Sequence, residues 1–146
     1  MEGVTKRTSK NAGDAGEYYV AYMLSRLGIS VALTTSGTSS VDLIATVDGS
    51  KSISIQVKGS WARSHPRQWM VGKHQPVVSP DFFYVFCNMS EDINMESAPE
   101  VFIVPSKIVK DVSTWQHSAP LFKIAKGQDK EFLYRWDYII EALTAK

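Results

Sequence analysis

The sequence has little cysteine and no long apolar run. One cysteine among 146 residues excludes an internal disulfide. Cys87 lies in the apolar segment DFFYVFCNM, where an inert core thiol is expected rather than a nucleophile. The opening MEGVTKRTSK has no apolar stretch of signal-peptide length, and the longest apolar run, residues 18–24, is too short to span a bilayer. These absences favour a cytoplasmic protein with no membrane segment.

Several common functional motifs are also missing. The chain contains no phosphate-binding or dinucleotide-binding glycine loop and no nucleophile elbow, which argues against the enzyme classes that depend on them. Its three histidines, His65, His74 and His117, lack the clustered spacing of a zinc site.

Acidic residues are absent from residues 49–80. The same stretch carries five basic residues, Lys51, Lys58, Arg63, Arg67 and Lys73, although the formal net charge of the whole chain is only +1. This distribution predicts a local basic face that can attract a polyanion. A solvated surface loop is the alternative interpretation.

Length and composition are those of one globular domain. Hydrophobic residues make up 44% and charged residues 21% of the chain, which is ordinary usage for a folded protein. We expect a flexible basic arm over residues 1–10 and a single domain over residues 11–146. No internal repeat or low-complexity tract interrupts that domain.

The pattern of apolar residues predicts a mixed α/β order. A helix is expected over residues 11–28, with Asp14 and Glu17 at the spacing of a capping box and Gly28 as its stop. Three strands should follow as a meander, over residues 29–35, 41–47 and 52–59. Two continuous apolar strands (82–89 and 100–105), a short helix capped by Ser106 and running to Val109, a possible edge strand (121–125) and a closing helix (129–146) complete the order.

The closing helix carries an apolar stripe. Leu133, Trp136, Ile140 and Leu143 recur at three-and-four spacing. Such a stripe packs either on the core of its own chain or in a seam between two copies.

Glu17 is the first candidate site residue. On the first helix it shares a face with Val20, Ala21 and Leu24, so its carboxylate points toward the apolar side and requires a partner. The capping box with Asp14 is one explanation, and a functional site is the other.

A second group of polar residues lies on the second and third strands. Asp42 is placed among apolar strand residues, where Asp is depleted. The returning strand alternates Ile53, Ile55 and Val57 on one face with Ser54, Gln56 and Lys58 on the other. In a hairpin of this length, Gln56 and Lys58 should lie beside Asp42.

This constellation resembles the active site of the PD-(D/E)XK nuclease superfamily. The resemblance covers roughly the first 60 residues: Glu17 on a helix, Asp42 on a strand, then Gln56-Val57-Lys58 in place of acid-x-Lys. Val41 stands where the motif has Pro, and Gln56 replaces the second acid, as in a minority of the superfamily that includes some homing endonucleases. The resemblance implies a restriction-endonuclease-like α/β fold, with a central mixed sheet flanked by helices.

The resemblance also implies an activity, the metal-dependent hydrolysis of phosphodiester bonds, with DNA favoured over RNA as substrate. Mg²⁺, with Mn²⁺ as a substitute, would be held by Asp42, Gln56, the Val57 carbonyl and Glu17, since Mg²⁺ prefers hard oxygen ligands. Lys58 would stabilise charge that develops on the phosphate or position the attacking water. Because Gln56 removes one negative charge from the cage, weak Mg²⁺ binding is expected before substrate arrives.

Residues after the motif are candidate contacts to nucleic acid. Basic side chains at Arg63, Arg67 and Lys73 can neutralise phosphates, and Ser60 lies beside them in sequence. Trp61 and Trp69 can stack on exposed bases, although both are equally suited to the core.

Two other functional classes remain open. The chain can be a binding or structural module that keeps the fold without the reaction, because a fold does not guarantee a function. It can also be a subunit whose closing helix serves an assembly. For an enzyme that cuts both strands of a duplex we expect a homodimer, the commonest symmetric oligomer.

Overall fold

The computed structural model describes residues 6–35, 40–62 and 67–145, which form four helices and seven strands. The order matches the predicted alternation except for one additional strand, β4, and a division of the closing helix. The elements are α1 (Ser9–Arg26), β1 (Ser30–Leu33), β2 (Leu43–Thr46), β3 (Ser52–Trp61), β4 (Arg67–Met70), β5 (Phe82–Met89), β6 (Glu100–Pro105), α2 (Ser106–Val112), β7 (Leu121–Ile124), α3 (Asp129–Phe132) and α4 (Trp136–Thr144).

Helix α1 begins earlier than the sequence pattern predicts. Its N-cap is Thr8, whose hydroxyl accepts a hydrogen bond from the Asn11 N–H, while the Asn11 side chain accepts one from the Thr8 N–H. The predicted capping box of Asp14 and Glu17 is therefore wrong, because a better cap lies six residues upstream. The predicted stop at Gly28 is confirmed: this residue has a φ of +84°, which favours glycine.

The beginning of α1 also shortens the predicted arm. Ser9 and Lys10 belong to the first turn of the helix, and Lys10 pairs with Asp14 one turn later, at 2.7 Å. Residues 1–5 of the predicted arm lie outside the described residues.

The central sheet has five strands in the order β1-β2-β3-β5-β6. The predicted meander is confirmed, since β1, β2 and β3 pair antiparallel to one another. Strand β3 then pairs with β5 in parallel, and β5 with β6 antiparallel, so the sheet is mixed. Strands β5 and β6 are buried over nearly their whole length, as expected for strands covered on both faces.

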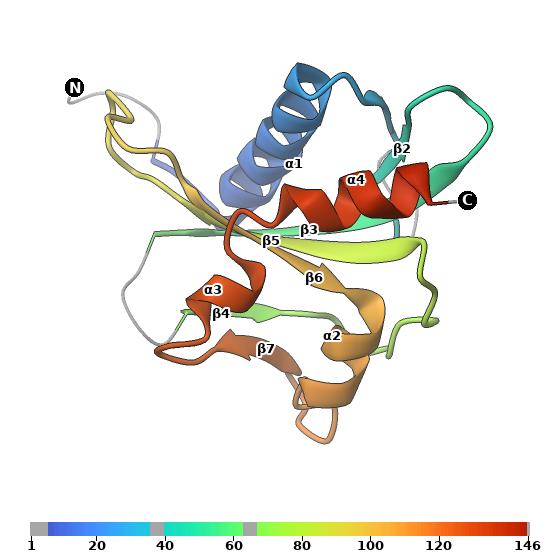
Figure 1. Ribbon diagram of the computed structural model, residues 1–146. Helices are drawn as coiled ribbons and strands as arrows, with labels where there is room; N and C mark the ends of the chain where they lie inside the picture. The colour runs from blue at the N-terminus through green and yellow to red at the C-terminus, as the bar shows by residue number, and fades with distance from the viewer. Residues whose placement is uncertain (1–5, 36–39, 63–66, 146) are drawn as a thin grey trace.

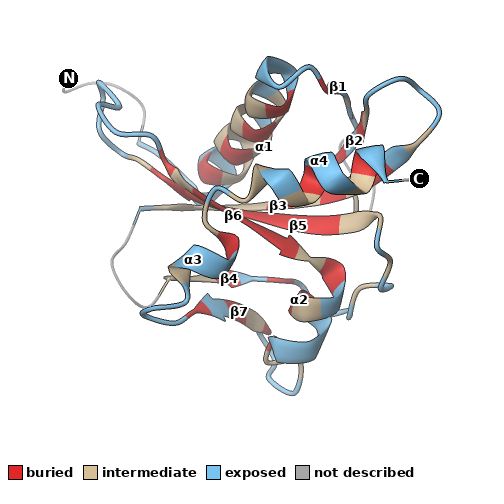
Figure 2. Cartoon of the chain, in the orientation of Figure 1, coloured by how far each residue is buried: buried red, intermediate tan, exposed pale blue. Residues whose placement is uncertain are grey.

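Each face of the sheet carries its own hydrophobic core (Figures 1 and 2). Helices α1 and α4 cover one face, where Val20 and Leu24 pack on Ile55, Val57 and other sheet residues. On the opposite face, Phe86 and Phe102 pack on Phe122 of β7 and on the Trp69 ring of β4. The molecule thus has three layers, with the sheet in the middle.

The layer on the face opposite α1 and α4 contains a small two-stranded sheet, which the sequence pattern does not predict. Strand β4 pairs antiparallel with β7, Trp69 lying opposite Phe122. The edge strand that the sequence suggests over residues 121–125 is confirmed as β7, and its partner is β4. Its alternate residues Phe122 and Ile124 bury their side chains under the main sheet.

The predicted closing helix is divided in two. Tyr134, with a φ of +56°, separates α3 from α4, and Leu133 bridges to Phe102 of β6. Leu143 is buried and Trp136 packs on the same core, whereas Ile140 is 39% exposed. Most of the predicted stripe is therefore occupied within the chain and leaves no continuous seam for a partner.

Helix α2 is longer than predicted and begins differently. It runs to Val112, and its N-cap is Pro105 without a side-chain cap. The Ser106 hydroxyl instead donates to the Ser79 carbonyl and accepts from the Ser79 N–H, which ties the loop before β5 to this helix. None of the helices in the described parts of the chain is long and apolar enough to cross a membrane.

Candidate active site

Asp42 lies immediately before β2, where that strand begins to pair with β3. Its N–H donates to the Ile55 carbonyl at 2.9 Å, and its carboxylate oxygen Oδ2 accepts from the Val57 N–H at 2.8 Å. The Asp42 carboxylate therefore accepts a hydrogen bond from the Val57 N–H at the point where β3 extends beyond the start of β2. This contact holds the Asp42 side chain at the edge of the sheet, close to the backbone of β3.

Gln56 and Lys58 follow the alternation of β3 that the sequence predicts. Val57 and Ile55 point toward α1, whereas Gln56 and Lys58 lie on the opposite face, along the wall of one cavity. Gln56 lies between Ile55, whose carbonyl accepts from the Asp42 N–H, and Val57, whose N–H donates to the Asp42 carboxylate, so Asp42 and Gln56 lie at the same end of the hairpin. The Gln56 amide oxygen Oε1 is buried and has no hydrogen-bond partner among the described residues.

Glu17 approaches Asp42 from the other side of the sheet. Its helix packs closely on β3: an ideal Cβ on Gly16 would lie 3.4 Å from a Val57 methyl. Glu17 thus comes from the α1 face, and Lys58 comes from the face that carries β4 and β7. Asp42, at the edge between these faces, is the electrostatic neighbour of both.

The pKa values of Glu17, Asp42 and Lys58 are all shifted from their ordinary values. Burial raises the pKa of Glu17, and the negative charges of Asp42 and Asp14 raise it further. Burial also raises the pKa of Asp42, against the opposing effects of the Val57 N–H and the Lys58 charge. Burial lowers the pKa of Lys58, and Asp42 partly restores it. Perturbed groups that share one place in a fold are characteristic of functional sites.

The oxygen atoms at this edge fit a hard divalent cation only in part. Within residues 6–35, 40–62 and 67–145, no three His, Cys, Asp or Glu side chains lie together as a metal site. The available donors are the Asp42 carboxylate, the unpartnered Gln56 Oε1 and the Val57 carbonyl, which points to the same side of β3 as the Val57 N–H. This donor set has the chemistry that Mg²⁺ prefers but a small negative charge.

No protein-family model matches the sequence, and no curated protein matches it either. The fold is similar to that of a bacterial homing endonuclease, I-Ssp6803I. That solved structure superposes with a TM-score of 0.66 over 96% of this chain and 96% of its own, at 15% sequence identity. At this sequence identity, the similarity shows that the two proteins share a fold and nothing more. In this chain that fold is a mixed sheet flanked by helices.

Two of the predicted contacts to nucleic acid are corrected by their surroundings. The Arg67 guanidinium is 13% exposed and binds Glu100 with two hydrogen bonds, of 2.7 and 2.9 Å, while Asp129 lies 3.5 Å away. Arg67 therefore links β4, β6 and α3 instead of presenting a free charge. Trp69 is 3% exposed and donates to the Cys87 carbonyl, so it is a core residue and no platform for a base.

Of the other predicted contacts, Lys73 is exposed, and Ser60 and Trp61 are partly buried. The Trp61 Nε1 donates to the Thr8 carbonyl at 2.9 Å, beneath the Arg7 guanidinium. Ser60 and Lys73 line a cavity beside Lys58. Arg63, like His65, lies outside the described residues.

A cavity of about 570 Å³ adjoins Gln56 and Lys58 on the face away from α1. Its far wall is the segment 71–77, which includes Lys73 and His74, and its floor includes the buried Tyr84. Sequence reasoning missed this wall because the segment has no regular pattern. It is held in place by β4, which precedes it, and no local signal predicts the pairing of β4 with β7.

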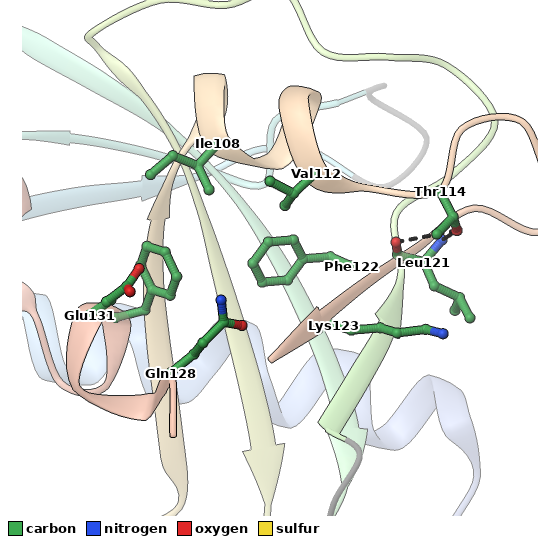
Figure 3. A pocket seen from close by; sticks show the side chains of 9 residues that line it. Ile108, Val112, Thr114, Leu121, Phe122, Lys123, Gln128 and Glu131 are labelled. Carbon is green, nitrogen blue, oxygen red and sulfur yellow. Dashed lines mark hydrogen bonds between the residues drawn. The ribbon is translucent and has the colours of Figure 1, made fainter. Parts of the chain in front are cut away.

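A smaller cavity of about 190 Å³ lies apart from the site, between α2, β7 and α3 (Figure 3). Ile108, Phe122 and Glu131 are among the residues that line it, and none of the predicted site residues does. Cys87 is also apart from the chemistry. It is fully buried, which raises the pKa of its thiol to about 12 and agrees with the expected inert role.

Proposed function

We propose that this chain is a metal-dependent endonuclease of the restriction-endonuclease-like, PD-(D/E)XK type, which hydrolyses phosphodiester bonds in DNA. The observation that carries the proposal is the position of Asp42. Its carboxylate accepts a hydrogen bond from the Val57 N–H, and its charge and that of Lys58 affect each other's pKa. Gln56, the neighbour of Val57 in β3, has a buried side-chain oxygen without a partner among the described residues. This arrangement occurs in a chain whose fold is similar to that of a homing endonuclease.

The proposed roles follow from the charges of the groups. Asp42, Gln56 Oε1 and the Val57 carbonyl would hold Mg²⁺ or Mn²⁺, with Glu17 on the opposite side able to accept a hydrogen bond from a water in the cation's shell. The bound cation would supply a Lewis acid for the phosphate and a lowered pKa for water. Lys58 would offset the negative charge that grows on the phosphate as the water oxygen bonds to phosphorus and the bond to a sugar oxygen breaks.

Burial of Lys58 serves this role in a specific way. Burial removes water from around the Lys58 ammonium group. The charge of this group therefore interacts more strongly with a phosphate than the charge of an exposed lysine would. The negative charge of Asp42 acts in the opposite direction and raises the pKa of Lys58. We also propose that the enzyme acts as a homodimer, because cleavage of both strands of a duplex commonly uses two sites related by a two-fold axis.

One observation favours a second candidate function. Among the described residues, the candidate site has two carboxylates, Glu17 on the α1 face and Asp42 at the sheet edge, and no cluster of three metal-binding side chains. A protein with so little negative charge can bind nucleic acid through Lys58 and the basic segment without cutting it. A binding module with a weak or inactive site is therefore the alternative.

Cleavage assays separate the two candidates. Linear, supercoiled and branched DNA are incubated with the protein over a series of Mg²⁺ and Mn²⁺ concentrations. Asp42→Ala should abolish cleavage, whereas Lys58→Ala should keep metal binding and slow the chemical step by about 10²–10³-fold, because its charge matters most in the transition state. Asp48→Ala, in the turn of the same hairpin, is the matched control and should cleave normally.

Gln56→Glu is the informative third variant. A further anionic oxygen should lower the Mg²⁺ concentration required for activity, since it strengthens the cage. If the wild-type protein binds these substrates but cleaves none, the binding module replaces the nuclease. If Asp42→Ala cleaves as well as wild type, the cleavage does not come from this site and the nuclease assignment to it is wrong.

A further inference from the structure

A cavity of about 860 Å³, larger than the one beside Gln56, adjoins the candidate site at the end of β3. Three residues, Lys58, Gly72 and Lys73, line both this cavity and the one beside Gln56. A phosphate held at Lys58 and Lys73 therefore has space on both sides. We call the larger space the β3-edge cavity.

The β3-edge cavity lies where β3 extends beyond the start of β2. Strand β2 begins at Leu43, opposite Ile55, but β3 continues to Trp61 and stays paired with β5 on its other side only. Beyond Val57, the N–H and C=O groups of alternate residues, beginning with Gly59, point to an edge that no strand of the central sheet covers. The Ser60 hydroxyl oxygen, which lies beside this edge, is buried and has no hydrogen-bond partner within the described parts of the chain.

The lining of the cavity combines apolar surface with hydrogen-bonding groups. Trp61, Met70 and Pro120 supply the apolar part, and the Met70 side chain is 67% exposed although it belongs to a strand. Gln68 and Ser60 supply an amide and a hydroxyl. A flat apolar ring with polar atoms on its edge matches these walls, and nucleobases have that form.

We propose that the β3-edge cavity binds one unpaired nucleotide of the nucleic-acid substrate, adjacent to the phosphate at Lys58 and Lys73. The proposal rests on the nuclease function above and narrows its substrate class to nucleic acid with an extrahelical or single-stranded nucleotide at the cleavage position. Bases within a continuous duplex are stacked and cannot enter a cavity in the protein unless they leave the stack. A substrate whose nucleotide is already unpaired avoids that cost.

Binding of a fluorescent probe tests this assignment. Two duplexes of the same sequence are compared, one fully paired and one with a single unpaired 2-aminopurine nucleotide, in chelator so that no cleavage occurs. Wild type should bind the second duplex about tenfold more tightly, which is the gain expected from stacking one base on side chains. With Mg²⁺ present, it should cut that duplex beside the unpaired nucleotide.

Ala119→Trp fills the β3-edge cavity, because Ala119 is an exposed residue in its wall. It should bring the affinity for the unpaired probe down to that for the paired duplex and leave the latter unchanged. Ala125→Trp, at an exposed position after β7 that lines neither cavity, is the matched control and should keep the preference. Met70→Ala is a milder second variant, should Ala119→Trp fail to fold, and should reduce the preference several-fold.

Each result has one consequence. Equal binding of both duplexes by wild type, or a preference that survives both Ala119→Trp and Met70→Ala, overturns the nucleotide cavity and leaves the nuclease function standing. Failure to bind or cut either duplex overturns the nuclease function, and the cavity assignment with it.

Discussion

Glu17, Asp42 and Lys58 are all titratable groups whose charged forms are destabilised by the folded structure. The pKa of each carboxylate is raised and the pKa of the lysine is lowered, with burial as the main cause in all three. A chain selected for stability alone would avoid these charges. Their presence together is what a functional site would require, at a cost in the free energy of folding.

A substitution at Glu17 tests that cost. The folded state binds the Glu17 proton more tightly than the unfolded chain does, so the free energy of unfolding contributed by this group falls as pH rises from its ordinary pKa of 4.5 through the raised one. Glu17→Gln removes the repulsion from Asp42. It should raise the free energy of unfolding by about 0.5 kcal/mol at pH 7, a small value because water screens this partly exposed group.

Urea unfolding at pH 4 and pH 7 provides the measurement. The gain should be present at pH 7 and vanish at pH 4, where the unfolded carboxyl is itself largely protonated. Glu141→Gln, at an exposed position of α4, is the control and should show no such dependence. A gain of equal size at both pH values would mean that charge repulsion is not its cause.

At the scale of elements, the contact of α1 with β3 decides whether Glu17 reaches the site. The two backbones approach so closely that an ideal Cβ on Gly59 would lie 2.4 Å from the Ala12 carbonyl oxygen. Only glycine permits this approach. The atom that a Cβ would meet belongs to the backbone of α1, which cannot move away as a flexible side chain could. The position of Glu17 relative to Asp42 therefore depends on a glycine 17 residues after Asp42 in the chain.

Gly59→Ala should move α1 away from the sheet. We expect a loss of about 2–3 kcal/mol in the free energy of unfolding, the usual cost of overpacking, together with reduced cleavage. Gly13→Ala is the matched control, because nothing lies within 4 Å of its ideal Cβ. It should stabilise α1 by about 0.5–1 kcal/mol through the better helix propensity of alanine. Chemical denaturation of both variants measures the difference, and equal effects would contradict this account of the packing.

At the scale of the whole molecule, the two layers that cover the faces of the sheet contribute different parts of the candidate site. The α1 layer supplies Glu17 and buries Val57 and Ile55, while the layer of β4 and β7 carries the segment 71–77 over Gln56 and Lys58. Arg67 joins this second layer to the sheet through Glu100 and, through Asp129, to α3. The basic segment that the sequence singles out is thus divided between a structural ion pair and the walls of two cavities.

Lys73 is the residue of that segment whose charge should act on nucleic acid, because it is exposed and lines both cavities. Lys73→Glu should weaken DNA binding for all sequences and lower the slope of log affinity against log salt by about 1, as expected for the loss of one phosphate contact. Lys126→Glu changes the net charge equally at an exposed position outside both cavities. Titrations at several salt concentrations compare the two, and identical slopes would exclude a phosphate at Lys73.

Local patterns in the sequence were sufficient for most of the elements, although not for β4 or for the division of the closing helix, and for part of the site. Alternation of Ile53, Ile55 and Val57 with polar residues predicts both the strand and its two faces, since side chains alternate in any strand. The turn after Val47 fixes a hairpin, and the hairpin brings Asp42 beside Gln56 and Val57. Such contacts are predictable because they join residues within one short hairpin.

Only the tertiary structure decided the surroundings of that hairpin. The pairing of β4 with β7 joins segments more than 50 residues apart, and it converts Arg67 and Trp69 from expected nucleic-acid contacts into an ion pair and a core side chain. The cavities beside Lys58 arise from the same pairing and from the extension of β3 past β2. Residues in a local pattern determine which face of a strand is polar, whereas the walls that enclose that face depend on contacts between distant segments, and these follow from the packing of the whole chain.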